Sequence, residues 1–203
     1  SISGLVRKTM QLLGRRLGEL PKETQEEARQ LLSCEGKVLK TLQKIVSQRI
    51  SAMKIRIHGD FHLGQVLYTG KDFAIIDFEG EPARAMGERR LKRSALRDVA
   101  GMIRSFHYAA YGTLFLRSTT RPEDRESLEP WADWWYSCAS GLFLKAYLDA
   151  VTNASFVPKD TAEFQMLLNA FIIEKAFYEV GYELDNRPDW AIIPLKGIQQ
   201  VLR

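Results

Sequence analysis

Cysteine is scarce in this sequence, and long apolar runs are missing from it. Two cysteines occur among 203 residues, Cys34 and Cys138, and neither belongs to a Cys-x-x-Cys pair. We therefore expect two reduced thiols, and neither a structural zinc site nor a disulfide framework. No run approaches the roughly 18 apolar residues of a membrane span, and the start, Ser1 to Gly4, lacks the charged and apolar regions of a signal peptide. The sequence thus predicts a water-soluble, cytoplasmic protein without a membrane partner.

A strong excess of one charge is also missing. The chain has 29 Lys and Arg against 25 Asp and Glu, a formal net charge of +4. The basic residues gather around Arg15 and Arg16 and between Arg84 and Arg97. The second cluster could bind the phosphates of a nucleotide, or it could be a solvated loop or a contact with another domain. No recognition-helix, zinc-finger or RNA-binding sheet motif is present, so no nucleic-acid partner is expected.

Most of the chain has the periodicity of helices. Apolar residues at helical spacing predict helices over residues 5–17, 23–50, 94–116, 131–151 and 160–182. The polar stretch 118–130 predicts a loop. With 45% hydrophobic and 27% charged residues, the chain can bury the core of one domain. The fold class predicted is mainly α (α+β).

Two features of these predicted helices allow more than one interpretation. Trp131, Trp134 and Trp135 could stack on a sugar, but aromatic residues at helical spacing more often pack into a core, which is the interpretation we prefer. Asp98, near the start of the helix over 94–116, could anchor a neighbouring loop or could stabilise the helix dipole, which is the commoner role.

A short β-hairpin is predicted between residues 65 and 77. Residues 65–69 and 72–77 have strand composition on either side of a Gly-containing turn. An antiparallel hairpin returns the chain beside its starting point, so Gln65 and Asp77 should lie close together. The apolar run before Asp77 suits a buried strand, which would place this carboxylate at the edge of a core.

Acidic side chains flank this hairpin. It is preceded by the segment His-Gly-Asp-Phe-His-Leu-Gly-Gln (58–65) and followed by the segment Asp-Phe-Glu-Gly (77–80). Phosphoryl transfer needs one carboxylate to orient and deprotonate the attacking hydroxyl, and further oxygen ligands to hold the magnesium that bridges the nucleotide phosphates. Asp60 and Asp77 could supply these groups. Either residue alone could merely cap a loop or a turn, but their pairing across a hairpin favours a phosphotransferase site.

These sequence motifs resemble those of the kinase-like phosphotransferases of the aminoglycoside phosphotransferase type. Within that group the sequence is most similar to maltokinases, including those fused behind trehalose synthase. The similar segments are His58–Gln65, Ile76–Pro82, Leu96–Met102 and Ser105–Ala110. The resemblance as a whole covers roughly residues 1 to 200. The resemblance implies transfer of the γ-phosphoryl group of ATP to the anomeric hydroxyl of maltose, giving maltose 1-phosphate and ADP, with Mg²⁺ as the cofactor.

The resemblance also implies roles for the residues around the hairpin. Asp60 would be the catalytic base, and His58 would orient its loop. Gln65 takes the position of the metal-binding Asn and Asp77 that of the metal-binding Asp. Glu79 replaces the Gly of the protein-kinase Asp-Phe-Gly motif and could be an additional metal ligand or an acid behind the ligands.

A second set of polar residues lies on the helix predicted over 160–182. Carboxylates and lysines bond sugar hydroxyls, and aromatic rings cover the apolar face of a sugar ring. In maltokinases a late helix likewise helps to form the sugar pocket, so we expect the sugar to be bound by Glu174, Lys175, Tyr178 and Glu179. The alternative is a surface network, such as Lys175 with Glu179 one turn later.

A nucleotide-binding lobe is missing from this sequence. Kinase-like enzymes bind ATP between a small sheet-rich lobe, which carries a Gly-rich loop and a lysine, and a larger helical lobe. Only helical periodicity precedes His58. We therefore interpret residues 1–203 as the helical carboxy-terminal lobe of a kinase-like fold, with the amino-terminal lobe absent. Its parts are scaffold helices (1–50), the catalytic loop and metal hairpin (55–82) and a helical acceptor-binding region (94–203).

Such a lobe is expected to be inactive alone. One alternative is a kinase-like docking or regulatory domain for trehalose synthase or another glucan enzyme. Another is an aminoglycoside or small-amine kinase, whose cationic acceptor would favour a more acidic pocket than the net charge of +4 suggests.

Overall fold

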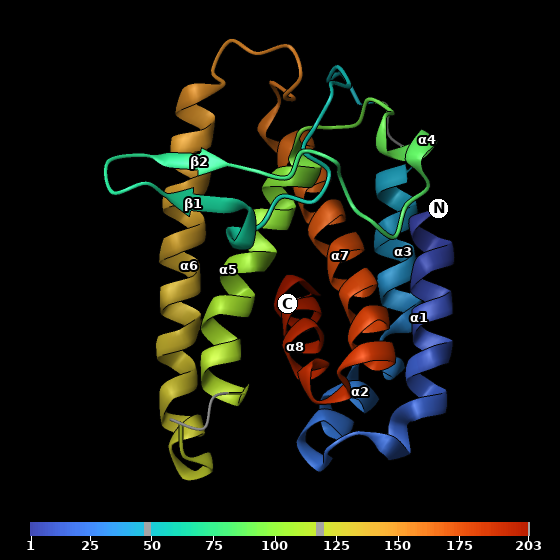
Figure 1. Ribbon diagram of the computed structural model, residues 1–203. Helices are drawn as coiled ribbons and strands as arrows, with labels where there is room; N and C mark the ends of the chain where they lie inside the picture. Colours follow the sequence, from blue (N-terminus) through green and yellow to red (C-terminus); the bar gives the residue numbers. More distant parts are fainter. Residues whose placement is uncertain (47–49, 117–119, 203) are drawn as a thin grey trace.

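Helices dominate the structure, and one short hairpin accompanies them (Figure 1). The computed structural model describes residues 1–46, 50–116 and 120–202. The helices are α1 (Ile2–Arg16), α2 (Lys22–Ser33), α3 (Glu35–Val46), α4 (Met86–Arg89), α5 (Leu96–Leu116), α6 (Arg125–Ala150), α7 (Thr161–Asn186) and α8 (Ile192–Leu202), and the strands are β1 (Val66–Tyr68) and β2 (Phe73–Ile75). The predicted mainly α fold with a small hairpin is therefore confirmed. None of the described helices is long and apolar enough to cross a membrane.

The amino-terminal helices differ from the prediction in one respect. The sequence predicts a single helix over 23–50, but the chain breaks at Cys34 into α2 and α3, and residues 47–49 lie outside the described residues. The Ser33 hydroxyl donates to the Gln30 carbonyl (2.7 Å), and such bonds from a side chain to the backbone compete with helix continuation. The break lets α2 pack against α8 while α3 packs against α1, so both apolar faces are buried.

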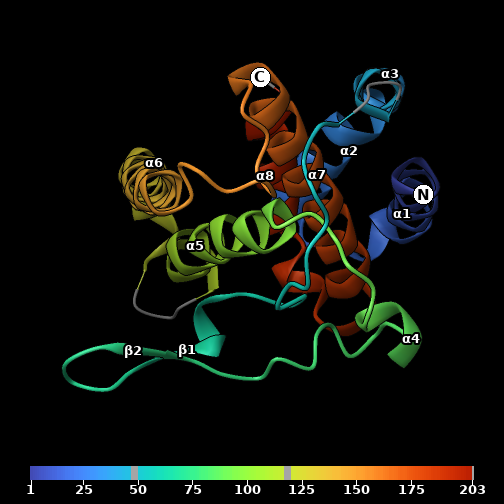
Figure 2. The ribbon, with the colours of Figure 1, turned by 90° about the horizontal axis from the view of Figure 1, so that it is seen from above.

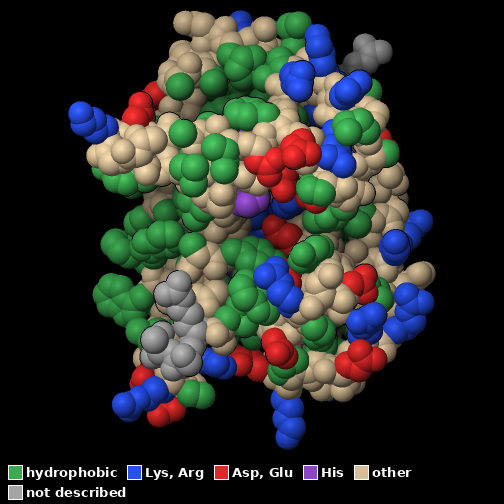
Figure 3. Space-filling model, in the orientation of Figure 1, with side chains coloured by type: hydrophobic (Ala, Val, Ile, Leu, Met, Phe, Trp, Pro, Cys, Tyr) green, Lys and Arg blue, Asp and Glu red, His purple; other side chains and the backbone are tan. Residues whose placement is uncertain are grey.

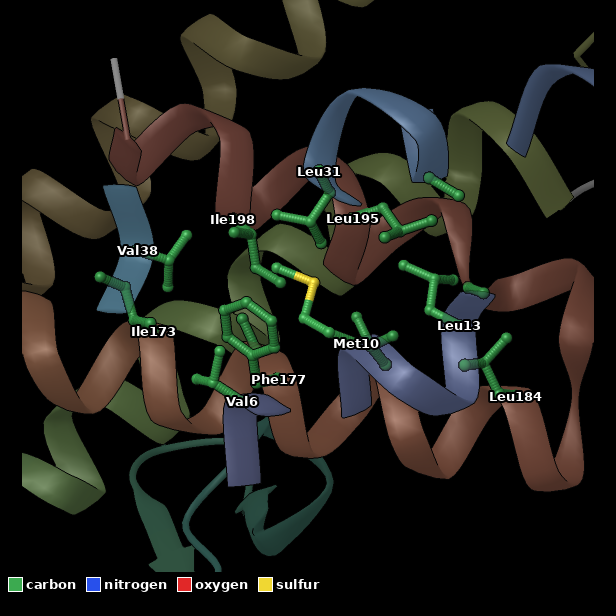
Figure 4. Close-up of a cluster of buried hydrophobic side chains, with 14 of the residues drawn as sticks. Val6, Met10, Leu13, Leu31, Val38, Ile173, Phe177, Leu184, Leu195 and Ile198 are labelled. Carbon is green, nitrogen blue, oxygen red and sulfur yellow. The ribbon is translucent and has the colours of Figure 1, made fainter. Parts of the chain in front are cut away.

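The main core lies between α1 and α7 (Figure 4). Side chains from these helices meet others from α2, α3 and α8, and all are at most 2% exposed: Val6, Met10, Leu13, Leu31, Val38, Ile173, Phe177, Leu184, Leu195 and Ile198. Burial of one such side chain is worth about 1.5–3 kcal/mol. This cluster therefore fixes α7, which also carries the polar residues predicted to bind a sugar.

Helix α6 stands at the edge of the molecule, beside α5 (Figure 2). It begins at Arg125, inside the stretch predicted as a loop, of which residues 118 and 119 lie outside the described residues. The expectation that its tryptophans pack into a core is wrong. The side of α6 that packs against the core carries Phe143, and the tryptophans are exposed. Trp131, Trp134 and Trp135 are 67%, 62% and 44% exposed.

The hairpin lies outside the core. Val66 pairs with Ile75 and Tyr68 with Phe73, which confirms the predicted pairing. The expectation of a buried strand before Asp77 is wrong, since Phe73 and Ile75 are 66% and 46% exposed. Figure 2 shows the pair projecting to one side of the helices, so that no helix among the described residues covers it. An apolar run of this length fits a buried strand equally well, and only the three-dimensional arrangement separates the two.

Candidate active site

The loop before the hairpin is held by hydrogen bonds at both of its ends. The Asp98 carboxylate, in the first turn of α5, accepts from the backbone N–H groups of His58 (2.7 Å) and Gly59 (2.9 Å). The His58 side chain donates from Nε2 to the Ile76 carbonyl (2.8 Å) and accepts at Nδ1 from the Asp60 backbone N–H (3.3 Å). Both bonds use the tautomer protonated on Nε2. The loop, the hairpin and α5 are thus tied together, and Asp98 has the anchoring role that the sequence ranked second.

Close backbone packing supports the same arrangement. A Cβ on Gly101 of α5 would lie 2.6 Å from the Phe61 carbonyl oxygen, so only glycine lets the helix approach the loop this closely. Gly59 has a φ of +88°, a conformation that side chains disfavour. Burial raises the pKa of Asp98, although its bonds from Gly59 and His58 act in the opposite direction.

Asp60, the predicted catalytic base, meets a lysine from α7. The Lys175 ammonium lies 3.3 Å from Asp60 Oδ1 and 3.4 Å from Glu81 Oε2. Burial acts against the charge of Lys175, but the carboxylates of Glu179, Asp60 and Glu81 outweigh it and raise the pKa of this lysine. The structure therefore brings together Asp60 and a residue 115 positions later in the chain, held as a charged pair.

Tyr178 completes this side of the site. Its ring lies under the Lys175 ammonium, 5.2 Å from centroid to nitrogen, one turn further along α7. Burial, followed by the charge of Glu81, raises the pKa of the Tyr178 hydroxyl. The phenol therefore stays protonated at neutral pH and can donate a hydrogen bond.

Gln65 and Asp77 lie side by side, as the hairpin geometry predicted. The Gln65 side-chain amide donates from Nε2 to Asp77 Oδ2 (2.9 Å), and the Ile76 backbone N–H donates to the Gln65 carbonyl (3.0 Å). Asp77 has a φ of +64°, in the left-handed region that few residues other than glycine adopt. This strained conformation aims the carboxylate back toward Gln65, and strain of this kind is often concentrated at functional sites.

A magnesium site could be built on these two residues. Carboxylate and amide oxygens are ligands that Mg²⁺ accepts, and the ion commonly takes one or two protein carboxylates and completes its shell with phosphate oxygens and water. Among residues 1–46, 50–116 and 120–202, no group of three or more His, Cys, Asp or Glu side chains is arranged to hold an ion. Glu79 extends instead toward Arg89 (3.7 Å) and is 75% exposed. Asp77 and Gln65 thus fit such an ion, whereas the recorded contact of Glu79 is with an arginine.

Glu174 and Glu179 occupy two different environments on α7. Glu174 lines the cavity beside Asp60 and pairs with Arg97 of α5 (2.8 Å). Glu179 does not line it. Its carboxylate accepts a hydrogen bond from Nε of Arg104 (2.8 Å) and lies 2.8 Å from Nη2, in an ion pair that is almost fully buried. Burial raises the pKa of Glu179, and the charge of Glu179 helps to raise the pKa of Lys175.

The cavity is mixed in charge (Figure 3). Figure 3 shows acidic, basic and histidine side chains gathered in a hollow at the centre of one face. Five acidic and five basic residues line the cavity: Asp60, Glu81, Glu88, Asp98, Glu174, Arg84, Arg89, Arg93, Arg97 and Lys175. The basic cluster of the sequence is thus brought to the site. The lining is neither strongly acidic nor strongly basic.

Two contacts of this site are absent from the sequence analysis. Glu81, in the Glu-Gly-Glu-Pro segment after the hairpin, bonds Lys175. Arg97 bonds Glu174. Each partner lies more than 70 positions away in the chain. Glu81 lies in the segment Ile76–Pro82, which resembles that of maltokinases. This resemblance is the signal that could have identified it.

Curated proteins that resemble this chain include two glucosamine kinases, whereas no protein-family model matches it. A glucosamine kinase of Streptacidiphilus jiangxiensis is 27% identical over 148 residues, which are 73% of this chain and 32% of that protein. A glucosamine kinase of Mycolicibacterium smegmatis (strain ATCC 700084 / mc(2)155) is 42% identical over 53 residues, 26% of this chain and 13% of that protein.

Solved structures extend the likeness over the whole chain. A glucosamine kinase in complex with glucosamine, ADP and inorganic phosphate has a TM-score of 0.75 at 20% identity, covering 100% of this chain and 45% of that one. A glucosamine kinase in crystal form B has a TM-score of 0.74 at 20% identity, covering 100% and 46%. This likeness shows the fold, which is that of part of a kinase. The chain spans less than half the length of the proteins that it matches.

Proposed function

We propose that this chain is the acceptor-binding lobe of an ATP-dependent sugar kinase. The observation that carries the proposal is the arrangement around Asp60. The carboxylate is fixed by its loop, bonded by Lys175 from α7, and followed by a hairpin that ends in the Gln65–Asp77 pair. These are the parts that phosphoryl transfer to a hydroxyl requires.

In this proposal Asp60 is the catalytic base. Its carboxylate orients the acceptor hydroxyl and takes its proton as the oxygen attacks the γ-phosphorus of ATP, and ADP leaves. Lys175 holds the carboxylate in place and donates to the sugar. His58 and Asp98 are positioning residues, because they bond the loop backbone and not the reacting groups.

Asp77 and Gln65 are the residues that would hold Mg²⁺. The bound ion would neutralise charge on the phosphate oxygens. The Gln65 amide turns its nitrogen to Asp77, so its oxygen is available to a ligand. Glu79 is paired with Arg89, and we assign it no direct ligand role.

Glu174, Lys175 and Tyr178 are proposed to bind the acceptor sugar. They line one cavity with Asp60 and offer donors, acceptors and an aromatic face, a combination that suits a sugar ring with its hydroxyls. Glucosamine is the first candidate acceptor, because the similar curated proteins carry that name. Maltose is the second candidate acceptor, supported by the four sequence segments that resemble those of maltokinases. The balanced charge of the cavity favours neither an amino sugar nor a neutral sugar.

A nucleotide-binding lobe outside this sequence is proposed to cover the hairpin. The apolar side chains of β1 and β2 are exposed, and the matched kinases are more than twice as long as the aligned region. The same exposed hairpin also suits the second candidate function, a docking domain for trehalose synthase or another glucan enzyme without catalysis of its own.

Substitution of Asp60 separates the two functions. In the full-length polypeptide, Asp60→Asn should lower ADP release in the presence of the acceptor sugar by about 10²–10⁴-fold, which is the usual contribution of a general base. Asp72→Asn, on the exposed hairpin turn, is the matched control and should retain activity. Unchanged turnover in folded Asp60→Asn would rule out the kinase proposal.

A further inference from the structure

One face of helix α6 is apolar and uncovered in the described part of the chain. The helix is 26 residues long and has no buried residue, because it packs on one side only. Exposed apolar or small side chains follow its outer side: Leu128, Trp131, Trp134, Trp135, Cys138, Gly141, Leu142 and Leu148. Figure 3 shows hydrophobic side chains along the left edge of the molecule, where Figure 1 places α6.

These residues have the spacing of a helix–helix seam. Leu128, Trp131, Trp135, Cys138 and Leu142 are separated alternately by three and four residues. This is the a/d pattern with which one helix packs along another. A helix that faces only water has no need for such a stripe, since its outer side would normally be polar.

The stripe is symmetric about its centre. Cys138 lies at the middle of α6, and six of the other seven members occur in three pairs at equal distances on either side. The pairs are Trp135 with Gly141, Trp134 with Leu142 and Leu128 with Leu148, while the position that corresponds to Trp131 is Lys145. A sequence with this symmetry matches itself when a second copy runs antiparallel across a two-fold axis, which is the geometry of most homodimers.

The size of the patch approaches that of a dimer interface. A Trp side chain offers up to about 250 Å², so the three indole rings leave on the order of 400 Å² exposed at their fractions of 67%, 62% and 44%. Leu142 is a further 70% exposed, and Leu128 and Leu148 are about 40% exposed. Standard interfaces bury about 800 Å² per partner, and monomers rarely expose apolar patches of this size.

We propose that α6 pairs antiparallel with α6 of a second copy of this chain, with the two-fold axis at Cys138. Lys145 of the second copy then lies level with Trp131, where its ammonium can stack on the indole. The open space at Gly141, where no atom lies within 4 Å of an added Cβ, receives Trp135 of the second copy. A membrane surface is a poorer occupant, since membrane-surface helices carry several Lys or Arg beside the apolar face and this face has Lys145 and Asp149.

Sedimentation velocity of the 203-residue chain, with and without Trp131→Glu, tests the pairing. We expect a reversible dimer between about 1 and 100 μM, whose dissociation constant rises at least tenfold, or about 1.4 kcal/mol, in the variant. Tyr68→Glu on the hairpin is the matched control, because Tyr68 is 68% exposed against 67% for Trp131, and it should leave the dimer intact. A monomer throughout this range would overturn the proposal, and so would a dimer that Trp131→Glu leaves unchanged.

Cross-linking tests the register independently of stability. In Cys34→Ser, a short bismaleimide should join two chains through Cys138, and Cys34→Ser/Cys138→Ser should not react. When the double variant also carries Trp131→Cys and Lys145→Cys, cross-linked dimers should form with a yield several times higher than with either cysteine alone. A dimer without these cross-links would show a different surface, such as a contact through the hairpin, and would contradict the proposed seam.

Discussion

At the scale of single residues, the site depends on the Asp98 carboxylate, which holds the loop of Asp60. Asp98 accepts two backbone hydrogen bonds from a segment about 40 positions earlier in the chain. The loop has no secondary structure of its own to hold it at that point. Asp98 therefore holds the loop that carries Asp60.

Removal of the Asp98 carboxylate should loosen the loop. Asp98→Ala leaves the N–H groups of His58 and Gly59 without their acceptor, which costs about 1–3 kcal/mol for a buried group. We expect lower stability in urea unfolding and at least a tenfold lower kcat, with a smaller change in KM. Asp98→Asn keeps one acceptor oxygen and should lie between the wild type and Asp98→Ala. Equal kcat for all three proteins would show that the loop holds its position without Asp98.

His107 should make stability depend on pH. Its ring is fully buried and stacked on Tyr111 at 4.3 Å. Burial, followed by the charge of Arg104 and then of Lys196, holds the pKa of His107 well below the ordinary value of 6.5. The unfolded chain binds this proton below about pH 6.5 and the folded chain does not. The contribution of neutral His107 to the free energy of unfolding is therefore complete above pH 6.5. It is lost as the pH falls toward the lower pKa of the folded state, by up to about 1.4 kcal/mol per pH unit.

Urea unfolding at about pH 7.5 and about pH 5 measures this effect. The free energy of unfolding of the wild type should fall more steeply between the two values than that of His107→Gln, whose side chain binds no proton in either state. The other titrating groups are common to both proteins and cancel in the comparison. Parallel pH dependence in the two proteins would contradict the proposed origin.

At the scale of elements, α5 must approach the loop that carries Asp60 closely. Gly101 provides that approach, since a Cβ there would meet the Phe61 carbonyl oxygen at 2.6 Å. Gly101→Ala should therefore separate α5 from the loop and lower both thermal stability and kcat. Gly112→Ala on the same helix is the matched control, because its Cβ would meet nothing closer than 3.8 Å. It should raise stability by up to about 1 kcal/mol through helix propensity. If both variants were stabilised equally, the contact at Gly101 would not be limiting.

The elements themselves were largely predictable from the sequence, whereas their exposure was not. The hairpin, its turn and the closeness of Gln65 to Asp77 follow from local composition and the geometry of a two-stranded pair. The burial of β2 was predicted wrongly because an apolar run does not reveal whether anything covers it. The loop anchor at Asp98 and the pair of Lys175 with Glu81 join distant segments, and periodicity carries no information about such contacts.

The tryptophans of α6 illustrate the same limit. Helical spacing correctly placed them on one helix, but not at the surface. A stripe that packs inside one chain and a stripe that packs between two chains have the same period. The distinction appears only once α5 and α7 are seen to occupy the other side of the bundle.

At the scale of the whole molecule, two exposed apolar surfaces lie on different elements. The hairpin is adjacent to the proposed phosphate and metal residues, whereas the outer side of α6 belongs to the bundle edge. The first suits a nucleotide-binding lobe and the second suits another copy of the chain. The cavity between α5, α7 and the hairpin holds all of the residues proposed to bind the acceptor sugar.

The most direct test of the account is a calorimetric titration of the full-length polypeptide with glucosamine and maltose, comparing the wild type with Lys175→Met. The account predicts that one of these sugars binds and that its dissociation constant rises at least tenfold in Lys175→Met, because the ammonium that bonds Asp60 and Glu81 is lost. Lys8→Met, an exposed lysine on α1, should bind like the wild type. Binding of neither sugar, or equal binding by wild type and Lys175→Met, would contradict the proposed acceptor site.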